Sequence, residues 1–283
     1  MNKKVSKLKT LKQKQAKQQL SDREKSAQQD LKAQLQKQID ALNFGNLKPE
    51  ETYTEVEKKH VADLTEKLKK EYSEQQITEA GRPNHPTGEA GRAMLERMND
   101  SHGPMTQWAL SHLQFGEKDW VLDIGCGGGA CIARLSTMVK DGTFVGIDYA
   151  KTSVEATRQF NQALIDAGKL EVIEASVSDM PFADDTFDKI VTVESYYFWP
   201  DFETDMQEVY RVLKPSGHFL LIAEVYDHVG LPQSVLDNIQ AYEMRNLDLD
   251  GFIDVFEKTG FADIAIHVKP GERWIAVEGI KKA

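Results

Sequence analysis

The chain has 283 residues, of which 40% are hydrophobic, and its formal net charge at pH 7 is −10. This apolar content suffices for a globular core, and no apolar run approaches the ~18 residues that a membrane span needs. Positive charge is concentrated at the beginning: residues 1–42 contain eleven Lys/Arg and four Asp/Glu, whereas residues 81–283 have a net charge of −14. The acidic body disfavours nucleic-acid binding, because phosphate contacts need clustered Lys and Arg.

The cysteines and histidines predict neither a disulfide scaffold nor a metal site. Cys126 and Cys131 are the two cysteines of the sequence, and their spacing is not that of a metal-ligand pair. The seven histidines form no HxxxH or HExxH pattern. The first residues are basic as in a signal peptide, but no apolar segment follows them. We therefore expect a cytoplasmic protein without a bound metal.

Residues 1–80 predict a charged helical extension. Leu31, Leu35, Ile39 and Leu42 are spaced by three and four residues, which is typical of one face of a helix. Three interpretations remain open for this segment: a solvated helix or partly disordered tail, a coiled coil or arm for self-association or a protein partner, and contact with acidic polymers.

Residues 81–115 predict a helical cap in front of the main domain. Pro and Gly punctuate a short helix near 87–99, and Pro104 suits the first turn of a second helix. From residue 120 onward, strands and helices alternate. The predicted strands are 120–125, 143–148, 170–175, 187–195, 218–224, 261–268 and 273–282, and the predicted helices are 129–139, 152–166, 203–213 and 249–259.

This alternation predicts an α/β fold for residues 81–283. Apolar strands that alternate with helices form a parallel sheet covered on both faces. The last two strands follow one another without a helix, which indicates an antiparallel strand at the end of the sheet. We predict a doubly wound, Rossmann-like, mostly parallel seven-stranded sheet with an antiparallel terminal strand, preceded by the helical extension.

A glycine cluster, "WVLDIGCGGGA", ends the first of these strands and opens a helix. Gly125, Gly127 and Gly129 would let a ligand lie against the backbone near a helix N-terminus. Asp148 ends the second strand, 23 residues after Gly125, and a carboxylate there can accept both hydroxyls of a ribose. Asp123 would repel the pyrophosphate of a dinucleotide but attract the amino group of a methionine moiety. The pattern therefore favours S-adenosylmethionine over NAD.

The order of four motifs resembles the class I S-adenosylmethionine-dependent methyltransferases: "VLDIGCGGG", "GIDYA", "DMPFADDTFDKIVTVES" and "EVYRVLKPSGHFLLIAE". The greatest similarity is to the small-molecule branch that includes ubiquinone/menaquinone-type methyltransferases. The resemblance spans roughly residues 87–283.

The resemblance implies a set of cofactor-binding residues. Gly125, Gly127 and Gly129 would line the methionine part, with Asp123 near its amino group. Asp148 would bind the ribose, and Tyr149 would pack on the adenine. Where the family usually has Asp then Ala for the adenine, this sequence has Ser176 and Val177, so we expect adenine recognition without a charge.

Methyl transfer from a sulfonium is an in-line displacement, so the sequence predicts no fixed catalytic triad. The candidate bases are Glu194, at the mouth of the fourth strand, and His102, in the cap. Tyr197, Trp199 and Arg92 are candidates for contact with a small-molecule substrate, although the aromatic residues of "ESYYFWPD" could instead pack beneath the following helix. A further candidate wall of the pocket consists of Glu224, Tyr226 and His228.

Three alternatives to a small-molecule methyltransferase remain open at this stage. The first is a dinucleotide oxidoreductase, which Asp123 disfavours. The second is a cofactor-binding module that assembles with a partner through residues 1–80. The third is an RNA methyltransferase, which the Lys-rich start favours, while the acidic body and "ESYYF" in place of an N-P-P-Y or D-P-P-Y tetrad disfavour it.

Overall fold

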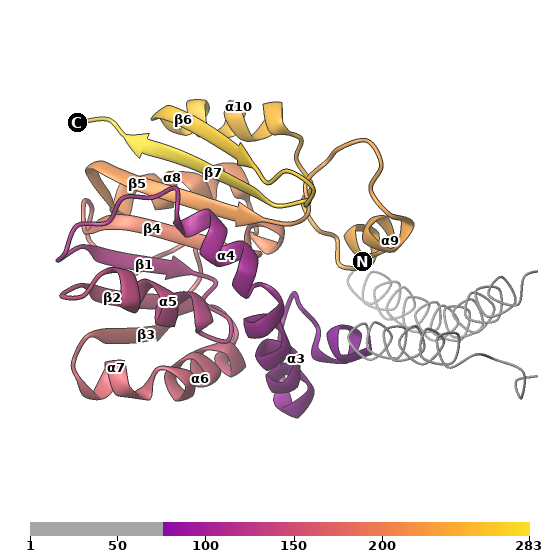
Figure 1. The fold of residues 1–283 in the computed structure, drawn as a ribbon, viewed down its shortest axis with the longest axis horizontal. Coiled ribbons are helices and arrows are strands. Elements are labelled where there is room, and N and C mark those ends of the chain that lie inside the picture. Colours follow the sequence, from indigo (N-terminus) through magenta and orange to yellow (C-terminus); the bar gives the residue numbers. More distant parts are fainter. Residues whose placement is uncertain (1–75) are drawn as a thin grey trace, which may run out of the picture. The chain divides into compact units, whose positions relative to one another are not determined.

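The computed structural model describes residues 76–283, and contacts divide the chain into two units, Met1–Gln75 and Gln76–Ala283. The second unit contains a seven-stranded sheet in the order β3-β2-β1-β4-β5-β7-β6 (Figure 1). Strand β7 runs antiparallel to β5 and β6, and the other pairs are parallel, which confirms the predicted fold. The strands are β1 (Trp120–Ile124), β2 (Thr143–Asp148), β3 (Leu170–Glu174), β4 (Phe187–Val193), β5 (Leu213–Ala223), β6 (Phe261–Val268) and β7 (Ile275–Lys281).

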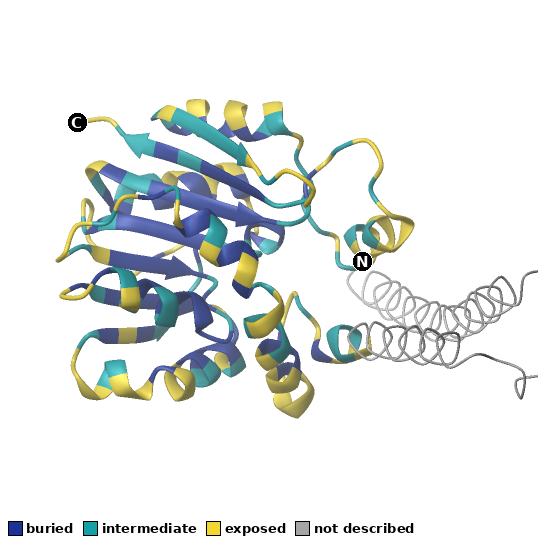
Figure 2. Ribbon diagram, viewed as in Figure 1, coloured by how far each residue is buried: buried dark blue, intermediate teal, exposed yellow. Residues whose placement is uncertain are grey.

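Helices cover both faces of the sheet, and the central strands are the most buried part of the domain (Figure 2). Leu110, Ile132 and Val154 bring α4, α5 and α6 onto one face, while Met206 and Phe256 bring α8 and α10 onto the other. The helices are α3 (Gly88–Ser101), α4 (Gly103–Leu110), α5 (Ala130–Met138), α6 (Lys151–Phe160), α7 (Gln162–Asp166), α8 (Phe202–Val212), α9 (Gln233–Ala241) and α10 (Leu249–Thr259).

The alternation of side chains along β1 determines on which face of the sheet Asp123 lies. Leu122 and Ile124 belong to the core beneath α8 and α10, and Val121 belongs to the opposite core. Because successive side chains of a strand point to opposite faces, Asp123 lies on the same side as Val121, where α4 and α5 pack. A carboxylate is therefore buried at the carboxyl end of an otherwise apolar strand.

Two predicted elements differ from the structure, and one helix was not predicted. The single helix predicted at 152–166 is two helices, because the chain turns at Asn161, whose side-chain amide donates to the carbonyls of Gly129 and Thr157 at 3.0 and 3.1 Å. Strand β5 begins at Leu213, five residues before the prediction, where it pairs with Phe187. Helix α9 was not predicted, and none of its residues is buried.

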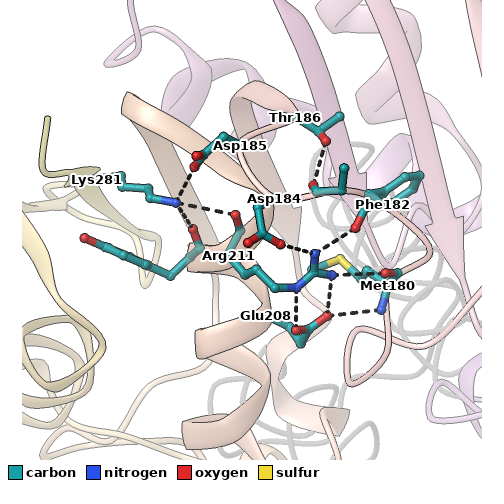
Figure 3. A network of polar contacts seen from close by, with 10 residues as sticks. Met180, Phe182, Asp184, Asp185, Thr186, Glu208, Arg211 and Lys281 are labelled. Carbon is teal, nitrogen blue, oxygen red and sulfur yellow. Dashed lines mark hydrogen bonds and ion pairs between the residues drawn. The ribbon is translucent and has the colours of Figure 1, made fainter.

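A polar network fixes the connection between β3 and β4 to helix α8 (Figure 3). The Arg211 guanidinium donates to both carboxylate oxygens of Glu208, to Asp184, and to the carbonyls of Met180 and Phe182, at 2.7–3.1 Å. The pKa of Glu208 is lowered, chiefly by this contact with Arg211. These bonds give the motifs "DMPFADDTFD" and "EVYRVLKP" a structural role: each supplies one side of the network.

The residues before β1 were predicted as a charged extension at 1–80 and a helical cap at 81–115. The coiled coil predicted within residues 1–80 lies outside the described residues, apart from a helical segment at 76–81. Two helices, α3 and α4, occupy the region predicted as the cap at 81–115. Over residues 76–283, none of the helices has the length and apolar character required to cross a bilayer.

Candidate active site

A cavity of about 420 Å³ lies at the carboxyl ends of β1, β2 and β4. The loop after β1 forms its floor, and helix α3 covers it with Met94, Leu95 and Met98. Ligands of open α/β sheets bind at this position, where the strand order reverses on either side of β1. The cavity lining includes Asp123, Gly125, Gly127, Asp148, Tyr149, Ser176, Val177, Glu194, His102 and Trp199, which the sequence predicts as site residues.

Asp123 is a buried carboxyl group with an unused acceptor. It is 1% exposed, and its Oδ2 atom has no hydrogen-bond partner. Burial raises the pKa of Asp123 to about 7; the Cys131 thiol bonded to it opposes this rise, and the nearby Asp148 adds to it. A buried acceptor without a donor is costly unless a ligand supplies the donor. The site therefore fits a ligand with a cationic or N–H group at this point.

Asp148, at the end of β2, links the glycine loop to the next helix. Its Oδ2 accepts from the backbone N–H of Gly127 at 3.1 Å, and its Oδ1 accepts from that of Ala150 at 2.9 Å. Burial raises the pKa of Asp148, against the lowering effect of these two N–H donors. Each carboxylate oxygen has a second lone pair, so Asp148 can still accept hydroxyl groups from a ligand in the cavity.

The glycines of the loop are needed partly for the protein's own contacts. Gly125 has φ +71°, and a Cβ on it would lie 2.5 Å from the Cβ of Ser195, which follows β4. Gly129 has φ +85°, and its Cβ would lie 2.5 Å from Nδ2 of Asn161. Gly129 does not line the cavity. Its position indicates that it closes the loop against α6 and α7, whereas Gly125 and Gly127 face the ligand space.

Replacing Gly129 by alanine should destabilise the domain more than the same change at another left-handed glycine. The positive φ costs about 1–2 kcal/mol at either place, and at Gly129 the new methyl group also meets Asn161 and lies 3.0 Å from Cα of Thr157. Gly168→Ala is the matched control, with φ +67° and no atom within 4 Å of its Cβ. Urea unfolding measures both losses, and equal losses would contradict the packing argument.

The residues expected around the adenine lie at the edge of the cavity. Tyr149 is 47% exposed, and its ring stacks on His85 with centroids 5.3 Å apart. Burial raises the pKa of Tyr149 to about 12, so its hydroxyl stays protonated. Ser176 and Val177 follow β3 and complete this part of the lining; the Ser176 hydroxyl accepts from the N–H of Ser178 at 3.2 Å.

Glu194 follows β4 in a strained backbone conformation. Its φ is +54°, a value that costs a non-glycine residue about 1 kcal/mol or more. Its Oε1 accepts hydrogen bonds from the Tyr197 hydroxyl at 2.8 Å and from the backbone N–H of Glu224. Burial raises the pKa of Glu194 to about 7, against the effect of the Glu224 N–H. A carboxyl group that titrates near neutrality beside a cavity can accept a proton.

His102 lies in the cavity lining between α3 and α4. Burial lowers the pKa of His102 to about 4, while Glu224 raises it and Arg97 lowers it further. The imidazole is therefore neutral at pH 7 and weakly basic.

The structure separates the residues expected to contact a substrate. Trp199 lines the cavity, and its indole N–H donates to the Ser195 hydroxyl at 3.2 Å. Tyr197 lies outside the lining and is 3% exposed in the core, because a 3-10 turn at Tyr196–Phe198 directs it under Glu194. Arg92 also lies outside the lining, and pairs with Glu155 at 2.7 Å on the surface.

The second group of wall candidates also lies outside this cavity. Glu224 pairs with Arg273 at 2.8 Å, and Tyr226 packs on His228 with ring centroids 4.7 Å apart.

Among residues 76–283, no group of three or more His, Cys, Asp or Glu is placed to hold a metal ion.

The roof of the cavity was not predicted from the sequence. Met94, Leu95 and Met98 line it, together with Asn99, whose amide donates to the Gly128 carbonyl at 3.0 Å. Arg134 of α5 is a further lining residue that the sequence analysis did not identify. The one available signal is the apolar spacing of residues 94, 95 and 98 in the first helix of the predicted cap.

Comparison with known proteins agrees with this geometry. Residues 122–221 match the family model described as "Methyltransferase domain" (Methyltransf_11). The chain is 35% identical over 100 residues to a fatty-acid O-methyltransferase of Mycolicibacterium smegmatis, covering 35% of either chain. It is 29% identical over 154 residues to 2-methyl-6-phytyl-1,4-hydroquinone methyltransferase 1 of Oryza sativa, covering 54% of this chain and 44% of that protein.

A solved structure shows the same fold. The phosphoethanolamine N-methyltransferase 2 of Haemonchus contortus superposes with a TM-score of 0.59 at 14% identity, covering 68% of this chain and 58% of that one. The chain spans 35–44% of the length of the two curated relatives above. The matched segment begins in β1 and ends in β5, and so contains the glycine loop, Asp148 and Glu194. The part of the chain from β1 to β5 is therefore similar to methyltransferase domains, on the α/β fold described above.

Proposed function

We propose that this protein transfers a methyl group from S-adenosylmethionine to a small-molecule acceptor by in-line displacement. One observation carries the proposal: the buried Oδ2 of Asp123 has no partner and belongs to a residue that lines the cavity at the end of β1. The amino group of a methionine moiety would supply the missing donors. A dinucleotide pyrophosphate would bring negative charge to the same carboxylate, which argues against the oxidoreductase alternative.

The other cavity residues fit the remaining parts of the cofactor. Asp148 retains lone pairs for the ribose hydroxyls, and the exposed ring of Tyr149 can pack on the adenine. Ser176 and Val177 offer a hydroxyl and an apolar edge to the base. We propose the cofactor contacts expected from the sequence, except at Gly129, which does not line the cavity and lies against Asn161 and Thr157.

The acceptor site is apolar on one side and carries one carboxyl group. Met94, Leu95 and Met98 of α3 and Phe198, which follows β4, line the cavity, and such a surface suits a flat or aliphatic acceptor. A fatty acid and a phytyl hydroquinone, named for the two curated relatives, have this character. We propose an apolar acceptor whose reacting atom carries a proton, and ubiquinone/menaquinone-type hydroquinones are candidates.

The protein's task in this reaction is alignment, exclusion of water and removal of one proton. S-adenosylmethionine supplies an activated methyl group on a positively charged leaving group. The apolar roof keeps water away from the reacting atoms, and Glu194 would accept the acceptor's proton at its carboxylate. Tyr197 is a positioning residue in this scheme, since its hydroxyl holds the carboxylate from the core side.

Calorimetry tests the proposed cofactor. Titration with S-adenosylmethionine, S-adenosylhomocysteine and NADH should show binding of the first two and none of the third. A methyl-labelled cofactor incubated with a metabolite extract, together with fatty acids and hydroquinones, then identifies the acceptor by its label. Binding of NADH without binding of either sulfur nucleoside would overturn the proposal.

Removing the Asp148 carboxylate should weaken cofactor binding by about 1–3 kcal/mol, because the ribose hydroxyls lose their acceptor in a buried site. Asp148→Ala is compared with Asp188→Ala, which removes a carboxylate that accepts from the Trp120 N–H at the opposite end of the same sheet. Calorimetry should show a loss of affinity in the first variant only. Equal affinity in wild type and Asp148→Ala would argue against the ribose assignment.

The role of residues 1–80 is a separate proposal. Their basic first half and helical spacing support an arm for self-association or for a protein partner. Light scattering of the full chain across ionic strengths tests this, because a charged interface weakens as salt screens it. A monomer at every salt concentration would remove the self-association proposal.

A further inference from the structure

We propose that Arg134 binds the carboxylate of the cofactor's methionine moiety, opposite the amino group held by Asp123. The inference rests on the proposed function and extends it, because it assigns both charged ends of the amino acid. Neither the glycine loop nor the carboxylate pattern of the sequence points to Arg134, which lies one turn inside helix α5.

Within the described part of the chain, Arg134 is a cation without an acidic partner. It lines the cavity, and its Nη1 donates to the Ala130 carbonyl of the same helix at 3.1 Å. Among residues 76–283, no carboxylate forms an ion pair with it. Its guanidinium has five N–H donors, so most of them remain for a ligand.

The start of α4 makes room for this guanidinium. A Cβ on Gly103 would lie 2.4 Å from Nη2 of Arg134 and 3.4 Å from its Cζ. Gly103 follows His102, which lines the cavity. The charged end of Arg134 therefore lies in the gap between α5 and the α3–α4 junction, directly against the junction's backbone.

Arg134 and Asp123 both affect the pKa of Cys131. Burial and Asp123 raise the pKa of the Cys131 thiol, and Arg134 lowers it. Cys131 and Arg134 are three residues apart on α5 and so share one face of that helix. Both line the cavity, as Asp123 does. An α-amino acid carries its ammonium and carboxylate groups on one carbon, so a neighbouring acid and cation match it.

The charge of the cavity requires such a cation. Asp123, Asp148 and Glu194 all line it, whereas His102 is neutral at pH 7. Of the described lining residues, Arg134 alone is positive at that pH. A ligand carboxylate would meet three acidic groups without compensation if Arg134 did not bind it.

The test separates the carboxylate from the rest of the ligand. S-adenosylhomocysteine and its decarboxylated analogue, which keeps the amino group, are titrated into wild type and Arg134→Gln by calorimetry. Loss of a charge-assisted bond should weaken S-adenosylhomocysteine about 10- to 100-fold in the variant. The decarboxylated analogue should bind both proteins equally, and wild type should prefer S-adenosylhomocysteine by a similar factor.

Two further variants control for structure. Arg158→Gln removes a guanidinium that donates to the Val172 carbonyl outside the cavity, and it should bind both ligands like wild type. Gly103→Ala keeps the charge but displaces it, and should weaken S-adenosylhomocysteine selectively. Equal weakening of both ligands in Arg134→Gln, or no weakening, overturns the inference. A wild type that binds neither ligand instead overturns the proposed function.

Discussion

Replacing Asp123 by asparagine should make the domain more stable above neutral pH and weaken its binding of the cofactor. The wild-type carboxylate is buried, its Oδ2 has no partner, and its pKa is raised from 3.8 to about 7. A shift of that size corresponds to about 4 kcal/mol of unfavourable free energy for the ionised form. Asparagine has the same shape without the charge, so Asp123→Asn removes that cost.

The stability difference should depend on pH with a defined sign. Because the folded pKa of Asp123 lies above its unfolded value, folding favours the protonated form. The penalty is absent below about pH 4, grows as the pH rises, and is complete above about pH 7. Urea unfolding at about pH 5 and about pH 8 should therefore show a larger gain for Asp123→Asn at the higher pH. His102, whose lowered pKa destabilises the fold in acid, is common to both proteins and cancels in the difference.

Cofactor binding should change in the opposite direction. The amino group of the methionine moiety loses a charged acceptor, which costs about 1.5–3 kcal/mol. Asp205→Asn is the matched control, since Asp205 is also buried with a pKa raised by burial but lies on α8 outside the cavity. Asp205→Asn should bind S-adenosylhomocysteine like wild type. An Asp123→Asn protein that loses stability at about pH 8, or binds the cofactor unchanged, would contradict the assignment.

The sheet could be predicted from the sequence because its strands are continuous apolar runs. "WVLDI" and "TFVGID" have the residues of buried parallel strands, and β2 ends at Asp148 as predicted. Two strands without a helix between them correctly indicated the antiparallel β7. Helix α9, which buries no residue, was not predicted.

The floor of the candidate site was predictable, and its roof was not. Asp123, Gly125 and Asp148 occur at fixed distances from strand ends, so local sequence determines their position. Met98 and Arg134 reach the cavity through the packing of α3 and α5, which depends on tertiary contacts. Tyr197 is the opposite case, because the sequence predicts it at the substrate site and the structure places it outside the cavity lining. A 3-10 turn at Tyr196–Phe198 causes this difference, and the sequence "ESYYF" does not specify that turn.

Replacing Glu194 by glutamine should lower kcat by about 100-fold or more if Glu194 accepts the proton of the acceptor. Glutamine retains the Oε1 that accepts from Tyr197 and from the Glu224 N–H, so the local structure should persist. The measurement uses the acceptor identified by the labelled screen, under single turnover. Glu278→Gln is the control, because Glu278 is a part-buried acid bonded to His218 at 2.6 Å outside the cavity.

The pH profile distinguishes Glu194 from His102 as the base. Glu194 must be ionised to accept a proton, and its pKa is about 7. At saturating cofactor, the bound ammonium group keeps Asp123 ionised, so kcat/KM for the acceptor reports Glu194 in the enzyme–cofactor complex. In wild type it should therefore rise with pH and level off above about pH 7. The pKa of His102 is about 4, so a histidine base would move the rise to that region. Glu194→Gln should lose the inflection near neutrality, while Glu278→Gln keeps it. Glu194→Gln has no carboxylate at this position, so an inflection that remains in the variant must come from another group. If the variant also keeps the wild-type rate, Glu194 is not the base.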